Sequence, residues 1–321
     1  MKKEAKIFIA GHKGLVGSAI LRKLQVQGYT NIVVRTHAEL DLLNQLEINT
    51  FFECEKPEYV FLAAAKVGGI IANSGHPAQF IYENMMIGFN VIHAAYMNKV
   101  KKLMNLGTAC IYPKMAPQPL KEEYLLTGAL EPTNDAYALA KISVIKLCRS
   151  YNEQYGTNFL SVMPCSLYGP GDSYDLNNSH VLPGMLRKFH EAKISGNDKV
   201  TLWGDGSPFR EFLYSEDLAD AVIYLMQNYN AIDLRTSLGD FINVGTGIDL
   251  TIRQLAEIIR DIVYADTNGR NCLIVWDTSK PNGTPKKVGD ISKLSALGFK
   301  PKIDFKDGIR LAYNDYVKRF G

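Results

Sequence analysis

The 321-residue chain has few cysteines and no pattern among them. They are odd in number and widely scattered, and none forms a CxxC pair or a spacing typical of a zinc site. The five cysteines are Cys54, Cys110, Cys148, Cys165 and Cys272. A disulfide framework and a metal site are therefore not expected, and a reducing cytoplasm is the expected location.

Long apolar runs and an excess of one charge sign are missing as well. No apolar stretch approaches the length that spans a membrane, and the early run "AKIFIAG" is too short for a signal-peptide core. The net charge of +3 is small for this length, whereas nucleic acid or an anionic membrane would need clustered basic residues. Neither is an expected partner, although local basic residues could still bind an anionic small molecule.

What the chain has is ordinary globular composition, with 46% hydrophobic and 21% charged residues, and enough length for two domains. Short apolar runs typical of buried strands alternate with segments of helical periodicity. We expect strands at 5–11, 31–36, 59–65, 101–108 and 158–164, and helices at 15–28, 44–54, 80–98 and 135–156. This alternation predicts an α/β fold with a doubly wound parallel Rossmann sheet.

The composition changes after Pro164. The segment "SLYGPGDSYDLNNSHVLPG" is rich in Gly, Pro, Asn and Ser, which predicts a loop or lid. Beyond it we expect a helix at 181–194, a strand at 199–203, a loop at 204–210, a strand at 241–247, a helix capped by Thr251, the strand "CLIVWD" and the turn "KPNGTP". No clean linker is visible. We therefore expect interleaved domains, with residues 1–165 and about 211–246 forming the Rossmann domain and about 166–210 and 247–321 a smaller α/β substrate domain.

A glycine-rich loop follows the first expected strand. Gly11, Gly14 and Gly17 form a GxxGxxG pattern at the start of the first helix. Glycines there allow a tight turn and a close approach of the backbone to a pyrophosphate. A glycine triplet alone is also compatible with a simple turn, but its place in the first βα unit favours a dinucleotide-binding loop. Lys13, Leu15 and Val16 belong to the same loop and are included among the cofactor-binding residues.

The end of the second strand bears on the choice of cofactor. An acidic residue there suits the ribose 2′-hydroxyl of NAD, whereas a basic residue suits the 2′-phosphate of NADP. In "VVRTHAELD", Arg35 comes first and Glu39 follows four residues later, and Lys13 adds positive charge. NADP(H) is therefore the favoured cofactor, with a solvated Arg35 at the strand end as the alternative.

Tyr137 and Lys141, in "TNDAYALAKI", are four residues apart and so lie on one face of the expected helix 135–156. An ammonium beside a phenol favours the phenolate, which makes the phenol a better acid for a carbonyl oxygen. Tyr-x-x-x-Lys alone is also common among surface pairs. Thr108 favours a catalytic role for this pair, because it ends the fourth strand at the edge of the sheet that carries the glycine loop.

Longer motifs add a family resemblance. The chain contains "GHKGLVGS", "LAAAKVGGI", "LGTACIYP", "EPTNDAYALAKI", "SLYGPGDSYDLNNSHVLP" and "WGDGSPFREFLY". Over nearly its whole length it resembles GDP-L-fucose synthase, an extended short-chain dehydrogenase/reductase. That family epimerises GDP-4-keto-6-deoxy-D-mannose at C3 and C5 and then reduces C4 with NADPH.

The resemblance implies a role for each residue of the expected catalytic set. Tyr137 would be the general acid at the C4 oxygen, and Lys141 would bind the nicotinamide ribose and lower the tyrosine pKa. Thr108 stands where the family usually has serine, and its hydroxyl can make the same hydrogen bond. Cys110 and His180 match the pair that moves protons at C3 and C5, a thiolate on one face and an imidazolium on the other. His180 also matches a cofactor contact.

The nucleotide-sugar end is expected around "WGDGSPFRE". An arginine fork such as Arg210 suits a diphosphate, and an indole such as Trp203 can cover a ring. The resemblance places both at the GDP-sugar, with Lys287 as a further basic contact. Three departures from the family pattern leave the exact sugar and the NADP preference open. Lys188 and Asn282 stand where arginine and aspartate are usual at the substrate, and His37 replaces an arginine near the 2′-phosphate.

The sequence motifs leave several functions open. The leading one is NADPH-dependent 4-reduction of a GDP-linked 4-keto-sugar with prior 3,5-epimerisation, by a cytoplasmic homodimer. A GDP-4-keto-heptose C4-reductase without epimerase activity would share the same motifs. A nucleotide-sugar 4-epimerase or dehydratase of the same fold, or a non-catalytic sensor, is a further alternative. Ala109 and Cys110 argue against the dehydratase, because an acid pair would follow Thr108 there.

Overall fold

The computed structural model describes residues 1–321 except 177–178, 268–270 and 281. Its largest feature is a parallel six-stranded sheet. The strands lie in the order β2 (Ile32–Val34), β1 (Ile7–Ala10), β3 (Tyr59–Leu62), β4 (Lys102–Leu106), β5 (Phe159–Pro164) and β9 (Phe241–Val244). The chain passes from β1 to β2 on one side and then to β3 on the other, which puts a crevice at the carboxyl ends of β1 and β3.

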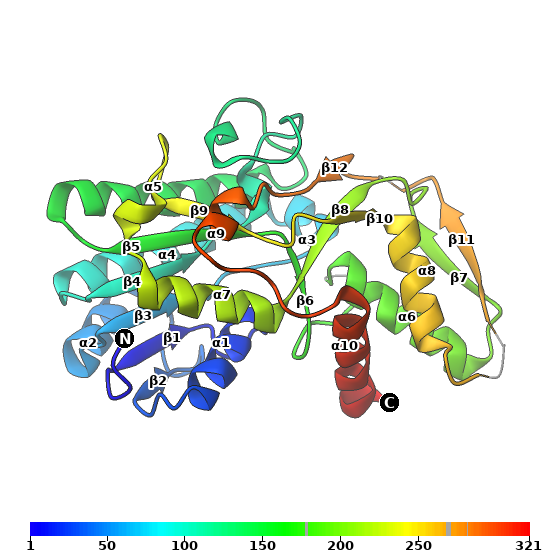
Figure 1. Cartoon of the computed structure of the whole chain (residues 1–321), viewed down its shortest axis with the longest axis horizontal. Helices are drawn as coiled ribbons and strands as arrows, with labels where there is room; N and C mark the ends of the chain where they lie inside the picture. The colour runs from blue at the N-terminus through cyan, green and yellow to red at the C-terminus, as the bar shows by residue number, and fades with distance from the viewer. Residues whose placement is uncertain (177–178, 268–270, 281) are drawn as a thin grey trace.

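Helices cover both faces of this sheet (Figure 1). One face carries α1 (Leu15–Val26) and α7 (Ser215–Asn228), and the other carries α2 (Gln45–Glu55), α4 (Pro77–Met97) and α5 (Asp135–Tyr155). The strands are buried on both sides, which explains their continuous apolar runs. The predicted doubly wound parallel Rossmann sheet is confirmed.

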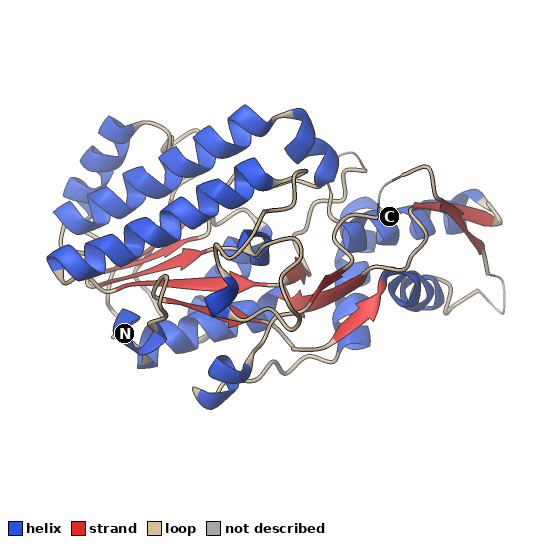
Figure 2. Cartoon of the chain, turned by 90° about the horizontal axis from the view of Figure 1, so that it is seen from above, coloured by secondary structure: helices blue, strands red, loops and turns tan. Residues whose placement is uncertain are grey.

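A smaller α/β unit lies beside the carboxyl ends of the strands. Its strands are β6 (Ser166–Tyr168), β7 (Lys199–Trp203), β8 (Phe209–Tyr214), β10 (Asp249–Thr251), β11 (Leu273–Asp277) and β12 (Lys286–Lys287). Its helices are α6 (Val181–Ser195), α8 (Ile252–Val263) and α10 (Phe305–Phe320), which pack around buried side chains such as Phe189 and Leu255. Figure 2 shows the N-terminus beside the large sheet and the C-terminus beside this smaller unit.

Some elements differ from the sequence-based expectation. The segment expected as a loop after Pro164 contains β6, which pairs in parallel with β8, and the loop expected at 204–210 ends where β8 begins at Phe209. The helix expected at 80–98 begins at Pro77 and is preceded by the separate helix α3 (Ile70–Gly75). Thr251 caps α8 as expected, since its hydroxyl accepts from the Gln254 N–H.

Two expected segments fall partly outside the described residues. The turn at 280–285 includes residue 281, and the loop or lid after Pro164 includes residues 177 and 178. Among the described residues, no helix is long and apolar enough to cross a membrane.

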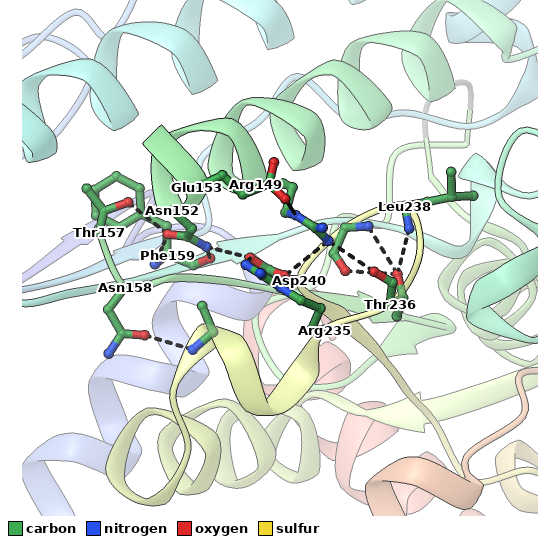
Figure 3. Close-up of polar contacts among 12 residues, drawn as sticks. Arg149, Asn152, Glu153, Thr157, Asn158, Phe159, Arg235, Thr236, Leu238 and Asp240 are labelled. Carbon is green, nitrogen blue, oxygen red and sulfur yellow. Dashed lines mark hydrogen bonds and ion pairs between the residues drawn. The ribbon is translucent and has the colours of Figure 1, made fainter. Parts of the chain in front are cut away.

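A buried acidic residue ties α5 to the sheet. The Asp240 side chain is fully buried just before β9 and accepts hydrogen bonds from Arg235 Nε at 2.9 Å and Asn152 Nδ2 at 2.8 Å (Figure 3). Arg149 Nη1 lies 3.4 Å from the same carboxylate and also donates to the Thr236 carbonyl at 3.0 Å. These contacts fix the start of β9 against the last turns of α5.

The chain returns to the sheet near its C-terminal end. After β11, residues 284–290 run across the carboxyl edge of the sheet, where β12 pairs in parallel with β8. Leu120 N donates to the Val288 carbonyl at 2.7 Å, and Asp290 N donates to the Leu120 carbonyl at 2.8 Å. The short helix α9 (Ser292–Ala296) follows and contacts β9. We call residues 284–290 the return segment.

Candidate active site

One cleft of about 1000 Å³ lies where the carboxyl edge of the large sheet faces the smaller unit. Its walls include every residue that the sequence predicted for the cofactor, the chemistry or the substrate, with the exception of Gly17. The predicted residues in the walls are Gly11, Lys13, Gly14, Leu15, Val16, Arg35, Thr108, Cys110, Tyr137, Lys141, His180, Lys188, Trp203, Arg210, Asn282 and Lys287. Segments far apart in the chain therefore meet at one place.

The glycine loop forms one end of this cleft. Gly11 has φ +86°, and a Cβ there would come within 2.7 Å of the Ala64 backbone nitrogen. Gly17 lies behind the loop in α1, where a Cβ would overlap the Gly11 carbonyl oxygen. Gly14 caps α1 without a side-chain hydrogen bond, so the first N–H groups of the helix are open to an anion. This loop fits the pyrophosphate of a dinucleotide.

Arg35 lies at the adenosine end but already has a partner. Its Nη2 lies 2.6 Å from Glu55 Oε1, and its guanidinium is 5.5 Å from the centroid of the Phe51 ring. His37 is more open, with 82% of its side chain exposed. Glu39 closes the turn by accepting from the Thr36 N–H at 2.7 Å, which explains an acidic residue here without assigning it to a ribose.

Lys141 is buried and Tyr137 is half-buried in the cleft wall on α5. Lys141 Nζ lies 5.9 Å from the Tyr137 ring centroid and donates to the Leu106 carbonyl at 2.9 Å. Burial lowers the pKa of Lys141 to about 8. Burial also raises the pKa of Tyr137 above its usual range, and the neighbouring Cys110 thiol raises it further. Desolvation therefore raises the pKa of Tyr137, whereas we had expected the Lys141 ammonium to lower it.

Thr108 and Cys110 sit at the carboxyl end of β4. Thr108 caps the short 3-10 helix η1 (Ala109–Ile111), and its Oγ1 accepts from Cys110 N at 3.2 Å. Lys287 Nζ lies 3.4 Å from Cys110 Sγ. Burial raises the pKa of this thiol, but Lys287, the Thr108 hydroxyl and Arg210 together outweigh burial, so the pKa is lowered overall.

His180 is the N-cap residue of α6 and faces the cleft from the smaller unit. The residue is exposed toward the open cleft. Desolvation by the cleft walls and, to a smaller extent, the positive charge of Lys287 lower the pKa of its imidazole. Both effects favour the neutral imidazole, whereas the family resemblance suggested an imidazolium.

The far end of the cleft carries the residues expected at the nucleotide-sugar. The Trp203 ring is 45% exposed, and the ammonium groups of Lys188 and Lys280 lie 6.0 and 5.6 Å from its centroid. Lys188 also donates to the Thr201 carbonyl at 3.1 Å. Asn282 Oδ1 accepts from the Asp205 N–H at 3.0 Å, so this side chain holds the 204–206 turn.

Three acidic residues in the cleft wall were missed by the sequence analysis. Glu211 and Asp172 are buried, and the pKa of Asp172 is raised to about 7 by desolvation. Glu131 is buried as well and pairs with Lys114 at 3.1 Å. Asp172 lies in the glycine- and proline-rich segment after Pro164, and Glu211 follows Arg210 directly, so both were adjacent to motifs that the sequence had identified.

A glycine loop, a Tyr–Lys pair and a Rossmann sheet that share one cleft define a dinucleotide-dependent enzyme of the epimerase, dehydratase and reductase class. The chain belongs to the NAD dependent epimerase/dehydratase family, which matches residues 7–245.

Similar proteins narrow the class further. GDP-L-fucose synthase 1 of Arabidopsis thaliana is 53% identical over 316 residues, covering 98% of this chain and 94% of that protein. A GDP-6-OMe-4-keto-L-xylo-heptose reductase from C. jejuni is 42% identical, with a TM-score of 0.94 and 99% of each chain covered. MlghC, a GDP-mannoheptose C4 reductase from Campylobacter jejuni with NADP bound, is 44% identical, with a TM-score of 0.89 and 99% coverage of each chain. The resemblance to GDP-L-fucose synthases is thereby confirmed.

Proposed function

We propose that this protein reduces the C4 ketone of a GDP-linked 4-keto-deoxy-sugar with NADPH after epimerising C3 and C5. The observation that carries the proposal is the joint presence, in one cleft, of a phenol held protonated and a thiol held toward its thiolate. The phenol suits protonation of an oxygen, and the thiolate suits removal of a proton from carbon.

The epimerisation would use Cys110 and His180. The protons at C3 and C5 are acidified because both carbons adjoin the C4 ketone. The Cys110 thiolate would remove such a proton, and His180 would deliver one from another segment of the cleft. The diphosphate of a GDP-sugar near Lys287 would offset the positive charge that now depresses the imidazole pKa, and so favour the protonated form.

The reduction would use Tyr137. Bound NADPH supplies the hydride that reaches C4. The Tyr137 hydroxyl would donate its proton to the C4 oxygen, and Thr108 would hold that oxygen from β4. Lys141 would bind the nicotinamide ribose while its Leu106 hydrogen bond fixes its position.

NADP(H) is supported by the NADP-bound relative MlghC and by the basic residues at the adenosine end. Lys13 lies in the glycine loop and can approach a 2′-phosphate. The Arg35 guanidinium has several N–H donors, so it can bind the 2′-phosphate while it keeps its ion pair with Glu55. His37 stands at this end of the cleft where the family usually has an arginine near the 2′-phosphate.

A C4-reductase of GDP-4-keto-heptoses without epimerase activity is the second candidate. It is favoured by the likeness to two reductases named for heptose substrates and by Lys188 and Asn282 at the sugar end. In that case Cys110 and His180 would bind the sugar without moving protons.

The organisation of the protein is also part of the proposal. We expect a cytoplasmic homodimer that serves polysaccharide biosynthesis. We also expect residues 1–165 with about 211–246 to bind NADP and about 166–210 with 247–321 to bind the GDP-sugar.

A reaction in D₂O with NADPH tests the proposal and separates its two candidates. GDP-4-keto-6-deoxymannose and GDP-4-keto-heptoses are compared, and product NMR reports reduction at C4 and deuterium at C3 and C5. Reduction with label at both carbons supports the epimerase-reductase. Reduction of the preferred substrate without label leaves the plain 4-reductase, and no NADPH oxidation with any of these sugars refutes both.

A further inference from the structure

A lysine from the far end of the chain lies against the Cys110 thiol. Lys287 Nζ lies 3.4 Å from Cys110 Sγ, within hydrogen-bond range for sulfur. The sequence analysis had placed Lys287 at the GDP-sugar, because the family resemblance suggested a basic contact there. The structure instead puts its ammonium against the thiol.

The backbone around Lys287 is held on several sides. Gly289 N donates to Glu211 Oε2 at 2.7 Å, and Val288 N donates to Gln118 Oε1 at 3.1 Å. Lys287 itself lies opposite Arg210 in the register of β12 and β8. The ammonium is thus carried by an anchored segment rather than by a free surface chain, which favours a fixed distance to the sulfur.

The charge balance around the thiol is positive. Lys287 from β12, Arg210 from β8 and Tyr137 from α5 interact electrostatically with the thiol. His180 lies near Lys287, and Glu131 lies near Arg210. Glu131 is already paired with Lys114 at 3.1 Å. Two cations therefore act on the sulfur while the Glu131 carboxylate is compensated, and an anionic sulfur is favoured.

We propose that Lys287 is the positioning residue that holds Cys110 as a thiolate and thereby prepares the base for proton removal. The role of the thiolate as a base rests on the proposed function, whereas the thiolate itself is a property of the free protein. In the proton transfer, the sulfur lone pair takes the proton at the carbon next to the ketone. The electrons of the broken C–H bond move onto the ketone oxygen as an enolate, and Lys287 keeps its own proton.

The pH dependence of Cys110 alkylation tests this proposal without any substrate. Iodoacetamide forms an S–C bond with the thiolate and releases iodide, and mass spectrometry of the Cys110 peptide separates this thiol from the other four. In Lys287→Met the pKa of Cys110 should rise by ~1–3 units, because an opposite charge within ~4–6 Å is worth that much. Alkylation at pH 7 should slow by about 10-fold for each unit.

Two further variants control the experiment. Lys287→Arg keeps the charge and should restore most of the low thiol pKa. Lys286→Met removes the neighbouring charge, which points to Asp249 at 3.0 Å, and should leave the alkylation profile unchanged. Wild-type Cys110 with the profile of an ordinary exposed thiol would overturn the proposal.

An unchanged profile in a folded Lys287→Met protein would also overturn it, even if that variant lost activity through weaker sugar binding. The D₂O experiment on the wild-type protein is independent of both results. A low thiol pKa that depends on Lys287, found together with no deuterium at C3 or C5, would therefore refute the epimerase activity and leave the role of Lys287 intact.

Discussion

Three groups in the cleft are displaced from their ordinary ionisation in different directions. Tyr137 is held protonated, Cys110 is held toward the thiolate, and the ammonium of Lys141 is easier to deprotonate than usual. Burial displaces the pKa values of Tyr137 and Lys141, whereas at Cys110 nearby positive charge and the Thr108 hydroxyl outweigh burial. Such separation of neighbouring groups is what assigns an acid and a base within one site.

Tyr137→Phe should abolish NADPH oxidation while the cofactor still binds. The substitution removes only the hydroxyl that would protonate the C4 oxygen, and general acid catalysis is typically worth ~10²–10⁴-fold. Turnover is measured by NADPH absorbance and binding by cofactor fluorescence. Deuterium exchange at C3 and C5 should continue, and turnover near that of the wild type would contradict the role of Tyr137.

Lys141→Met should stabilise the protein at neutral pH and still abolish reduction. The unfolded chain keeps the Lys141 proton up to about pH 10.5, but the folded chain keeps it only up to about pH 8. Burying the charged form therefore costs stability below pH 8, and this cost fades as the pH rises toward 10.5.

The gain in Lys141→Met should be on the order of 1–3 kcal/mol, since each pKa unit corresponds to about 1.4 kcal/mol and the Leu106 hydrogen bond is lost. Urea unfolding at pH 7 and pH 9.5 measures it, with Lys146→Met on the same helix as the control. An equal stability difference at both pH values would show that the buried charge is not the cause.

At the scale of elements, the junction between α5 and β9 depends on one carboxylate. Asp240 compensates the guanidinium groups of Arg235 and Arg149, both of which lie against its Oδ1 (Figure 3). A buried acid of this kind is needed because both arginines are partly removed from water.

Asp240→Ala should lower the free energy of unfolding by about 3 kcal/mol. Breaking a buried ion pair from one side typically costs ~3–5 kcal/mol, and the lower end applies because Arg149 keeps Glu153 as a partner at 2.6 Å. The shift in the urea midpoint, followed by circular dichroism, gives the value. Glu153→Ala, on the exposed side of the same arginine, should cost less than about 1 kcal/mol. Equal losses in both variants would refute this account.

Many of the elements could be predicted because each is either a short apolar run or an amphipathic helix. β5, β7 and α6 begin and end within a residue or two of their predicted bounds. β6 was missed because Gly169 and Pro170 follow it directly and make the whole segment look like a loop. Helix α3 was missed because Gly68, Gly69 and an exposed apolar pair give it no helical periodicity.

The candidate site could be predicted less completely than the fold. Residues on recognisable motifs, such as Gly11 and Tyr137, were identified because their chemistry depends on local spacing. The contact between Lys287 and Cys110 could not be predicted, because it joins segments far apart in the sequence through backbone pairing that leaves no local pattern. The pKa directions were also out of reach, since they depend on burial.

At the scale of the whole molecule, Glu211 joins three segments at the cleft. Its Oε1 accepts from the N–H groups of Thr246 and Gly247 at 2.6 and 2.7 Å, and its Oε2 accepts from Gly289 N at 2.7 Å. A single buried carboxylate thereby holds β8, the loop after β9 and the return segment together.

Glu211→Gln should destabilise the fold and loosen the return segment. The glutamine keeps one acceptor oxygen, but its NH2 group cannot accept a hydrogen bond, so at least one of the three N–H groups loses its partner. Each unsatisfied buried N–H costs about 1–3 kcal/mol. The melting temperature should fall, and the Cys110 alkylation profile should move toward that of Lys287→Met. Glu123→Gln, at an exposed site in the short 3-10 helix Glu122–Tyr124, should change neither measurement. A folded Glu211→Gln protein with a wild-type alkylation profile would show that Glu211 does not position Lys287.

The return segment has a consequence for how the enzyme matures on the ribosome. The last strand of the large sheet ends at Val244, so the whole large sheet has been synthesised before Lys287 leaves the ribosome. A nascent chain at that stage could assemble the sheet and its glycine loop while the Cys110 sulfur still lacked its nearest cation. The thiol would become an effective base only after the final segment is threaded across the edge of the sheet. Synthesis from the N-terminus would thus leave the Cys110 thiol without the cation that lowers its pKa until the rest of the cleft has been made.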